Sequence, residues 1–375
     1  MPLAQPNSYW QEYQTKAVYA SSGDANSDQL SSGGLRQLSR IQSTSFSIDA
    51  PLVENVYLDS SVEPYNSFPP GVSVDIRWLH TNGSTEYYIG LAKLDPSGTI
   101  VLGLEDEKNL YISMEDQLGI DAIGAPLAGP RTVLGLGNAV MTAYEIGGRV
   151  GGLIESRATM SCLTANVYTG FSGVTVPSVN YQNGGSQTGQ FIIPAPQSQY
   201  SSDRSITGQP AALGGQEMIM IFSQNSPFGA VLTGQNSCYL QSFNLGLSID
   251  RQEQKPLGYV YPKARPIVYP IRVDLSAEAI VSKYQADTLE RFGCNSTGFS
   301  IQMIVKQPCT NLTLFGFFFD NLQLQSQSFG QSIGPLDTAN LKWRGWIRTP
   351  NDMFIDPSFN YIINLQTSGA YGDQW

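Results

Sequence analysis

Short segments in which apolar and polar residues alternate run along most of the chain, separated by Gly, Pro and Asn. Alternation with a period of two places every second side chain on the same face, which is typical of a β-strand with one buried face. The clearest examples lie at residues 46–48, 72–78, 87–91, 144–146, 271–275, 299–305 and 322–324. We therefore predict an all-β fold with long hairpins and few short helices.

One segment has a helical pattern instead. Between Ala277 and Arg291, apolar residues follow a period close to that of an α-helix. Those lying roughly along one face are Ala279, Ile280, Tyr284 and Leu289. Gly293 follows, and Gly commonly ends a helix. We expect a helix over these residues.

A segment near the N-terminus is repeated in the second half of the chain. Ile41-Gln42-Ser43 corresponds to Leu240-Gln241-Ser242, an offset of 199 residues that continues without a gap. Identical pairs are Glu54/Glu253, Leu58/Leu257, Val74/Val273 and Asp75/Asp274, and similar pairs are Phe46/Leu245, Ile48/Leu247, Val72/Ile271 and Ile76/Leu275. The alternative is two unrelated strand pairs with a generic pattern. Because polar identities keep the same register, a duplicated β module is favoured.

The repeat suggests how the chain is organised. We expect an N-terminal arm over residues 1–40, a first β module over 41–129, a Gly-rich middle β segment over 130–236, a second copy of the module over 237–347 and a C-terminal tail over 348–375. Chains of this length have ample material for a core.

Charge is sparse and acidic. The chain has 21 Lys+Arg against 31 Asp+Glu, a formal net charge of −10, and only 14% charged residues. No basic cluster is present, which argues against a nucleic-acid-binding protein. No apolar run reaches the roughly 18 residues of a membrane-spanning helix, and residues 1–26 lack the features of a secretory signal. We expect no membrane association.

Candidate chemistry is equally sparse. The only histidine is His80, so any Ser-His or Cys-His mechanism would have to use it. No CxxC pair is present, and we expect no metal or other cofactor and no enzymatic activity. A disulfide between Cys294 and Cys309 is conceivable, but buried free thiols at Cys162, Cys238 and these two positions are favoured.

Two glycine motifs have structural interpretations that outweigh the chemical ones. Gly330-Gln-Ser332-Ile-Gly334 matches the nucleophile elbow of serine hydrolases, yet no histidine follows it. The stretch from Gly147 to Gly152 lacks the lysine of a phosphate-binding loop, and alternation continues through it. We interpret it as part of a long bent hairpin.

Acidic and basic clusters leave more than one interpretation open. Glu105-Asp106-Glu107 and Glu115-Asp116 could support glycosidase chemistry, but surface solvation or pairing between subunits is favoured. The second copy carries basic residues where the first has none: Lys255, Lys263, Arg265 and Arg272. These suit either a head-to-tail contact with an acidic face or a solvated surface.

Several runs carry a family resemblance through their order along the chain. They are Glu107-Lys-Asn-Leu-Tyr-Ile-Ser113, Gly135-Leu-Gly-Asn-Ala-Val-Met-Thr-Ala-Tyr144 with Arg149-Val-Gly151, Leu240-Gln-Ser-Phe243 with Leu257-Gly258 and Tyr269-Pro-Ile271, and Gln325-Ser-Gln-Ser-Phe329 with Ser332-Ile-Gly334. Over most of residues 41–347 the chain resembles tailed-bacteriophage virion structural proteins, with the closest similarity to the major tail tube type.

The resemblance implies duplicated tail-tube-like β-sandwich or β-barrel modules that join across subunits into an inner barrel. The chain would pair with itself, as a trimeric pseudo-hexameric or hexameric ring that stacks into a tube. It would also contact other phage tail proteins and hold DNA only as non-specific cargo. The location implied is the virion tail, after synthesis in the host cytoplasm. An acidic and neutral lumen would let DNA slide.

The candidates for assembly and hairpin contacts are Glu54, Asp75, Tyr144, Ile146, Arg149, Val150, Leu240, Gln241, Lys263, Arg265, Arg272 and Asp274. The segments expected to line the lumen are 141–149, 157–167, 240–251 and 271–280. Alternatives are a capsid-decoration, neck or adhesin-like glycan-binding protein and, least favoured, a hydrolase built on carboxylates.

Overall fold

The computed structural model describes most of the chain. The described residues are 13–30, 34–49, 52–56, 62–66, 70–81, 83–94, 100–116, 132–169, 173–181, 189–194, 212–215, 218–222, 238–281, 299–306, 313–330 and 337–348. Nearly all regular elements in these residues are strands, and the helices α1 (Ser27–Gln29) and α2 (Ser84–Tyr88) are short. The predicted all-β fold is confirmed.

The strands fall into two series along the chain. The first series is β1 (Tyr13–Ser22), β2 (Arg36–Gln37), β3 (Ile41–Asp49), β4 (Leu52–Val56), β5 (Val62–Asn66), β6 (Gly71–Leu79), β7 (Ala92–Leu94), β8 (Ile100–Leu102), β9 (Lys108–Asp116), β10 (Thr132–Arg149), β11 (Glu155–Cys162) and β12 (Thr164–Thr169). The second series is β13 (Val174–Thr175), β14 (Gln190–Phe191), β15 (Met218–Phe222), β16 (Cys238–Ser248), β17 (Ile271–Val281), β18 (Phe299–Lys306), β19 (Thr313–Gly330) and β20 (Asp337–Ile347).

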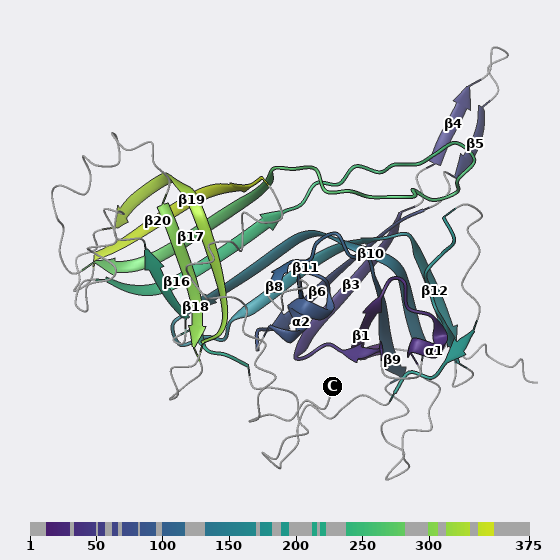
Figure 1. The fold of residues 1–375 in the computed structure, drawn as a ribbon, viewed down its shortest axis with the longest axis horizontal. Coiled ribbons are helices and arrows are strands. Elements are labelled where there is room, and N and C mark those ends of the chain that lie inside the picture. The colour runs from purple at the N-terminus through teal and green to yellow at the C-terminus, as the bar shows by residue number, and fades with distance from the viewer. Residues whose placement is uncertain are drawn as a thin grey trace, which may run out of the picture.

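One antiparallel sheet joins most of these strands. Its main path is β15-β18-β19-β20-β17-β16-β10-β11-β6-β3, with β9 and β12 paired to β10 and β1 paired to β9. In Figure 1 the green-to-yellow strands β16 to β20 gather on the left and the purple-to-teal strands on the right. The pairs β4–β5, β7–β8 and β13–β14 are separate small sheets.

The strand order is the same in the two halves of this sheet. The first copy has the order β3-β6-β11-β10 and the second copy has β16-β17-β20-β19. Each copy then extends in the same way, because β10 pairs with β9 and β9 with β1, while β19 pairs with β18 and β18 with β15. Strands β10 and β19 each span 18 residues and belong to both parts of their copy. The chain therefore contains a duplicated β module.

The register of pairing agrees with the duplication and corrects its alignment. Both β3–β6 and β16–β17 shift register at a glutamine, Gln42 in one pair and Gln241 in the other. Thr44 lies opposite Ile76 on β6, and its equivalent Phe243 lies opposite Ala277 on β17. The second strand is thus displaced by two residues from the ungapped alignment, and Asp75 and Asp274 are not equivalent.

The structure also divides the chain differently from the sequence-based boundaries. The segment expected as an arm over residues 1–40 contains β1, whose Val18, Tyr19 and Ala20 are buried. The middle segment over residues 130–236 has no separate unit in the described residues. Its strands β10 and β11 belong to the first copy, and β15 belongs to the second. The tail over residues 348–375 lies outside the described residues except at position 348.

The helix expected from Ala277 to Arg291 is wrong over its first residues. Strand β17 continues to Val281, and residues 282–298 lie outside the described part of the chain. Ala277 and Ala279 are buried while Ser276 and Glu278 are half-buried, which is the period of two expected for a strand. Pairing with β16 on one side and β20 on the other overrides the helical preference of alanine.

The core lies on one face of the sheet. Along β6 the burial alternates strictly, with Val72, Val74, Ile76 and Trp78 buried. The same face continues through Tyr144 and Ile146 on β10, Leu245 and Leu247 on β16, Val273 and Leu275 on β17, and Leu341 and Trp343 on β20. Among the described residues, no helix is long and apolar enough to span a membrane.

Candidate assembly surface

The opposite face of the sheet is polar and charged. We call the strands β3-β6-β11-β10-β16-β17-β20-β19 the shared sheet and this side of it the polar face. Register and exposure place as many acidic as basic residues on it: Asp49, Asp75, Glu145, Glu155, Asp274 and Glu278 against Arg77, Arg149, Arg157, Arg272, Lys342 and Arg344. The acidic excess of the chain is therefore not concentrated here, contrary to the acidic lining expected from the sequence.

Ion pairs on the polar face centre on one aspartate in each copy. Asp75 lies 2.6 Å from Arg157 Nε and 3.6 Å from Arg77 Nε. Asp274 lies 2.6 Å from Arg272 Nε and 2.8 Å from Arg344 Nε. Partial burial raises the pKa of Asp274, but hydrogen bonds from the two arginines outweigh it and hold that pKa below its ordinary value.

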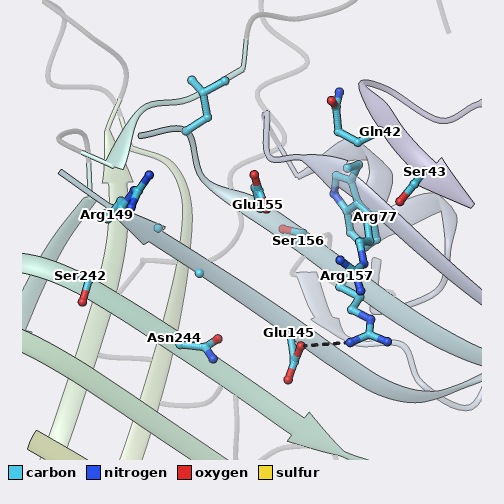
Figure 2. Close-up of a pocket in the computed structure, with 14 residues that line it drawn as sticks. Gln42, Ser43, Arg77, Glu145, Arg149, Glu155, Ser156, Arg157, Ser242 and Asn244 are labelled. Atoms are coloured by element: carbon cyan, nitrogen blue, oxygen red, sulfur yellow. Dashed lines mark ion pairs between the residues drawn. The ribbon is translucent and has the colours of Figure 1, made fainter. Parts of the chain in front are cut away.

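A depression of about 800 Å³ lies on the polar face where the two copies meet. Its charged lining comes from both β11 and β10, with Glu145 and Arg157 3.9 Å apart across it. Figure 2 shows these side chains with Arg77 beside them and Ser242 and Asn244 contributed by β16. The depression is open and its charges are mixed in sign, so it has the character of a solvated surface between strands rather than an enclosed binding site.

The two copies join where β10 pairs with β16, and we call this pairing the junction. Ile146 lies opposite Leu245 and Tyr144 opposite Leu247, and all of these side chains are buried. A Cβ added to Gly148 would lie 2.9 Å from the Phe243 ring, so glycine permits the close approach there. Tyr144 and Ile146, predicted as assembly candidates, therefore make their contacts within the chain.

The remaining predicted candidates lie at several places. Arg149 and Val150 are exposed where β10 ends, in the Gly-rich hairpin to β11 that the sequence predicted. Leu240 and Gln241 are half-buried at the register shift of β16. Glu54 belongs to β4.

Each copy sends a long excursion from the same edge of the shared sheet. Neighbouring strands are antiparallel throughout, so β3 and β16 run in the same direction and their following segments leave together. The first-copy arm is the β4–β5 hairpin, and the second-copy arm is residues 249–270. Figure 1 shows the second-copy arm crossing from the left strands toward β4–β5 on the right.

Two arginines hold the second-copy arm to the first copy. The guanidinium of Arg251 donates to the carbonyl oxygens of Met141 at 2.9 Å, of Arg265 at 2.9 Å and of Leu104. Burial, together with the neighbouring charge of Arg265, lowers the pKa of Arg251 to about 10. At the tip, Tyr261 packs against Leu163, Val179 and Tyr181.

Arg265 is almost fully buried and pairs with a carboxylate of the first copy. Its Nη2 donates to Glu107 Oε1 at 3.0 Å and also to the Asn138 carbonyl oxygen, and its Nη1 donates to the Ser161 carbonyl oxygen at 3.1 Å. Tyr181 donates to the other oxygen of Glu107 at 2.6 Å. The basic cluster of the second copy thus meets an acidic residue, but within one chain, while Lys263 and Lys255 stay exposed.

Asn138 organises this site, and sequence analysis did not select it. It lies at the register shift of β10 with φ 53°, a left-handed conformation that asparagine tolerates better than most residues. Its amide nitrogen donates to Glu107 Oε2 at 2.7 Å, and its amide oxygen accepts from the Val179 backbone at 3.0 Å. The sequence signal was present as an asparagine between glycines and small residues within an otherwise apolar strand.

The single histidine lies in a buried polar cluster beneath the first copy. His80 Nδ1 is 2.8 Å from Glu86 Oε1 and 3.3 Å from Ser156 Oγ, and Trp78 and Tyr144 donate to the same Glu86 oxygen at 3.1 and 3.3 Å. A catalytic triad needs its serine and its acid on opposite ring nitrogens. Here both approach Nδ1 inside the core, so the cluster has the geometry of a structural network.

Burial and charge shift the pKa values in this cluster. Burial alone raises the pKa of Glu86, but the charge of His80 and the hydrogen bonds outweigh it, so that the pKa lies below its ordinary value. The pKa of Tyr144 is raised by burial and by the neighbouring Glu86 charge. The carboxylate therefore stays ionised and the phenol stays neutral.

Other predicted chemical features are placed in part. Cys162 is a buried free thiol whose pKa burial raises to about 12. Cys294, Cys309 and Ser332 lie outside the described residues. Glu105 and Asp106 are exposed, and within the described residues no cluster of His, Cys, Asp and Glu could hold a metal ion.

No protein-family model matches this chain, and no curated protein matches it. The functional argument therefore rests on the duplicated sheet, its polar face and its edges.

Proposed function

We propose that this chain is a structural virion protein that self-assembles into stacked rings, forming a phage tail tube through which DNA passes. The observation that carries the proposal is the duplicated strand order, which places two copies of one module side by side in a single continuous sheet. A chain that already joins two modules edge to edge has the geometry needed to continue the same sheet into further chains.

The polar face supports a role as the lumen. Acidic and basic side chains alternate on it, and Asp75 and Asp274 neutralise the arginines beside them. Nucleic-acid binding needs cations that are free to replace the counterions of phosphates. A charge-balanced wall lacks that excess of cations, so DNA would slide along it without being held.

The duplication also bears on stoichiometry. Each chain supplies two modules, so three chains would form a ring with pseudo-six-fold symmetry, whereas six chains would form a larger ring with twelve modules. We favour the trimeric ring, because the family that the chain resembles builds its tubes from rings of six modules.

The test is to purify the full chain and examine it by negative-stain electron microscopy and by native mass spectrometry. Rings or tubes with three-fold or six-fold symmetry support the proposal. A persistent monomer, or a compact particle without a central channel that binds glycans, would overturn it in favour of a decoration or adhesin-like protein. Incubating the assembled protein with double-stranded DNA at low salt should show no retention.

A further inference from the structure

The two copies differ most at the outer edge of the shared sheet. Phe46 and Ile48 on β3 are 48% and 53% exposed. Their equivalents on β16, Leu245 and Leu247, are 0% and 2% exposed. All of these side chains lie on the apolar face, because Phe46 is opposite Val74 and Ile48 is opposite Val72.

The junction explains why the second copy is covered. Strand β10 lies beside β16 and places Ile146 opposite Leu245 and Tyr144 opposite Leu247. Strand β3 has no such neighbour in the described part of the chain, where it pairs only with β6. The first copy therefore has the same apolar positions but no strand to cover them.

The strand that could fill this role is the equivalent of β10 in the second copy, namely β19. Tyr144 lies opposite Ala158, which lies opposite Ile76. In the second copy Gln327 lies opposite Leu341, which lies opposite Ala277, the equivalent of Ile76. Gln327 therefore takes the position of Tyr144, and two residues further Phe329 takes the position of Ile146.

This part of β19 is also an open edge. From Gln323 to Gly330 it pairs with β20 on one side, and no described strand lies on the other. Its sequence carries no charge or proline, and β3 carries only Asp49 at its end. Natural edge strands usually carry such residues to prevent pairing, so both edges are unprotected.

We propose that the C-terminal part of β19 in one chain pairs antiparallel with β3 of a second copy, in the register of the internal junction. Ser328 then lies opposite Ser47, Phe329 opposite Phe46 and Gln327 opposite Ile48. This inference rests on the proposed self-assembly and specifies the surfaces that join. The contact is head-to-tail, because it uses different edges of the two chains, and such contacts close into rings.

The register is tested by disulfide formation between chains. Two single variants of the full chain, Ser47→Cys and Ser328→Cys, are mixed, assembled and oxidised, and the products are separated without reductant. Opposite residues in antiparallel strands have Cα atoms roughly 4.5–5.5 Å apart, within reach of a disulfide. We expect a covalent dimer in the mixture, and only background levels when either variant or the unmodified chain is oxidised alone.

A shifted pair provides the matched control. Ser45→Cys mixed with Ser328→Cys is displaced by two residues, which separates the positions to roughly 7–8 Å and should leave little cross-linking. Stronger cross-linking of this pair would overturn the register. Assembly into rings without cross-linking of either pair would overturn edge pairing while leaving the proposed function intact. A chain that remains monomeric would overturn both, and circular dichroism checks that each variant is folded.

Discussion

Arg265 of the second copy and Glu107 of the first form an ion pair of 3.0 Å that fastens the second-copy arm across the junction. The side chain of Arg265 is 2% exposed and that of Glu107 is 21% exposed, so most of the pair is shielded from water. Together with the carbonyl contacts of Arg251, this pair makes the two copies one packed unit rather than modules connected only by their strands.

Replacing Arg265 with leucine should destabilise the chain. The change leaves Glu107 without its cation and removes the donors to Asn138 and Ser161. Loss of one partner of a buried ion pair typically costs about 3–5 kcal/mol. We expect a lower free energy of unfolding in urea and faster tryptic cleavage after Lys255. Lys263→Leu, on the same arm but exposed, should change the free energy of unfolding by less than about 0.5 kcal/mol. Equal effects of the two variants would contradict the anchoring role.

Glu86→Gln should be strongly destabilising, because it removes the anion that His80, Trp78 and Tyr144 surround. The expected loss is about 3–5 kcal/mol at pH 7. Trp78 fluorescence during urea unfolding would follow the transition. Glu155→Gln is a matched control, since Glu155 is exposed on the polar face and its replacement should have little effect.

The stabilising effect of Glu86 should depend on pH. The pKa of Glu86 in the folded chain lies below the ordinary value of 4.5, so its contribution is fully present above that pH. As the pH falls through the folded pKa, the proton that binds in both states removes the contribution. The difference in free energy of unfolding between the wild type and Glu86→Gln should therefore narrow below pH 4.5. A difference that stays constant down to pH 3 would show that the carboxyl is not ionised in the folded chain.

Gly137 should tolerate no side chain. A Cβ there would contact the Pro177 carbonyl oxygen and the Thr164 hydroxyl more closely than real Cβ atoms do. Gly137→Ala should lower the free energy of unfolding by about 1–3 kcal/mol, the usual range for overpacking. Gly246→Ala provides the control, because its nearest neighbours would be 4.0 Å away. If both variants melt at the same temperature, the close packing of β10 against residue 177 is not rigid.

Local patterns predicted the elements well where alternation was strong. The pattern over residues 72–78 predicted β6, and that over 299–305 predicted β18. Alternation succeeds because one face of each strand is buried, and this requirement acts on every second residue. It failed at Ala277 and Ala279, whose small side chains fit a strand or a helix and left the outcome to the neighbouring strands.

The site was less predictable because it depends on contacts between distant residues. The equivalence of β10 and β19 was missed, since Tyr144 and Gln327 occupy the same position but share no chemistry. The Arg265–Glu107 pair joins residues 158 apart, and no local pattern specifies such a contact. Phe46 and Leu245 could be matched from the sequence, but only the sheet order shows that one is covered and the other is not.

The uncovered residues of β3 lead to the last prediction. Phe46→Lys and Ile48→Lys each place a charge on the apolar side of an edge strand, where a second chain would have to bury it. Both side chains are about half exposed in the single chain, so each variant should fold. We expect native mass spectrometry to show a monomer for both, with circular dichroism and melting temperature close to those of the wild type. Ile192→Lys is the matched control, because Ile192 is 74% exposed and lies away from the shared sheet, beside β14. It should assemble as the wild type does. If Phe46→Lys and Ile48→Lys assemble normally while Ile192→Lys does not, the interface lies on the other side of the molecule and β3 is covered by something other than a second copy.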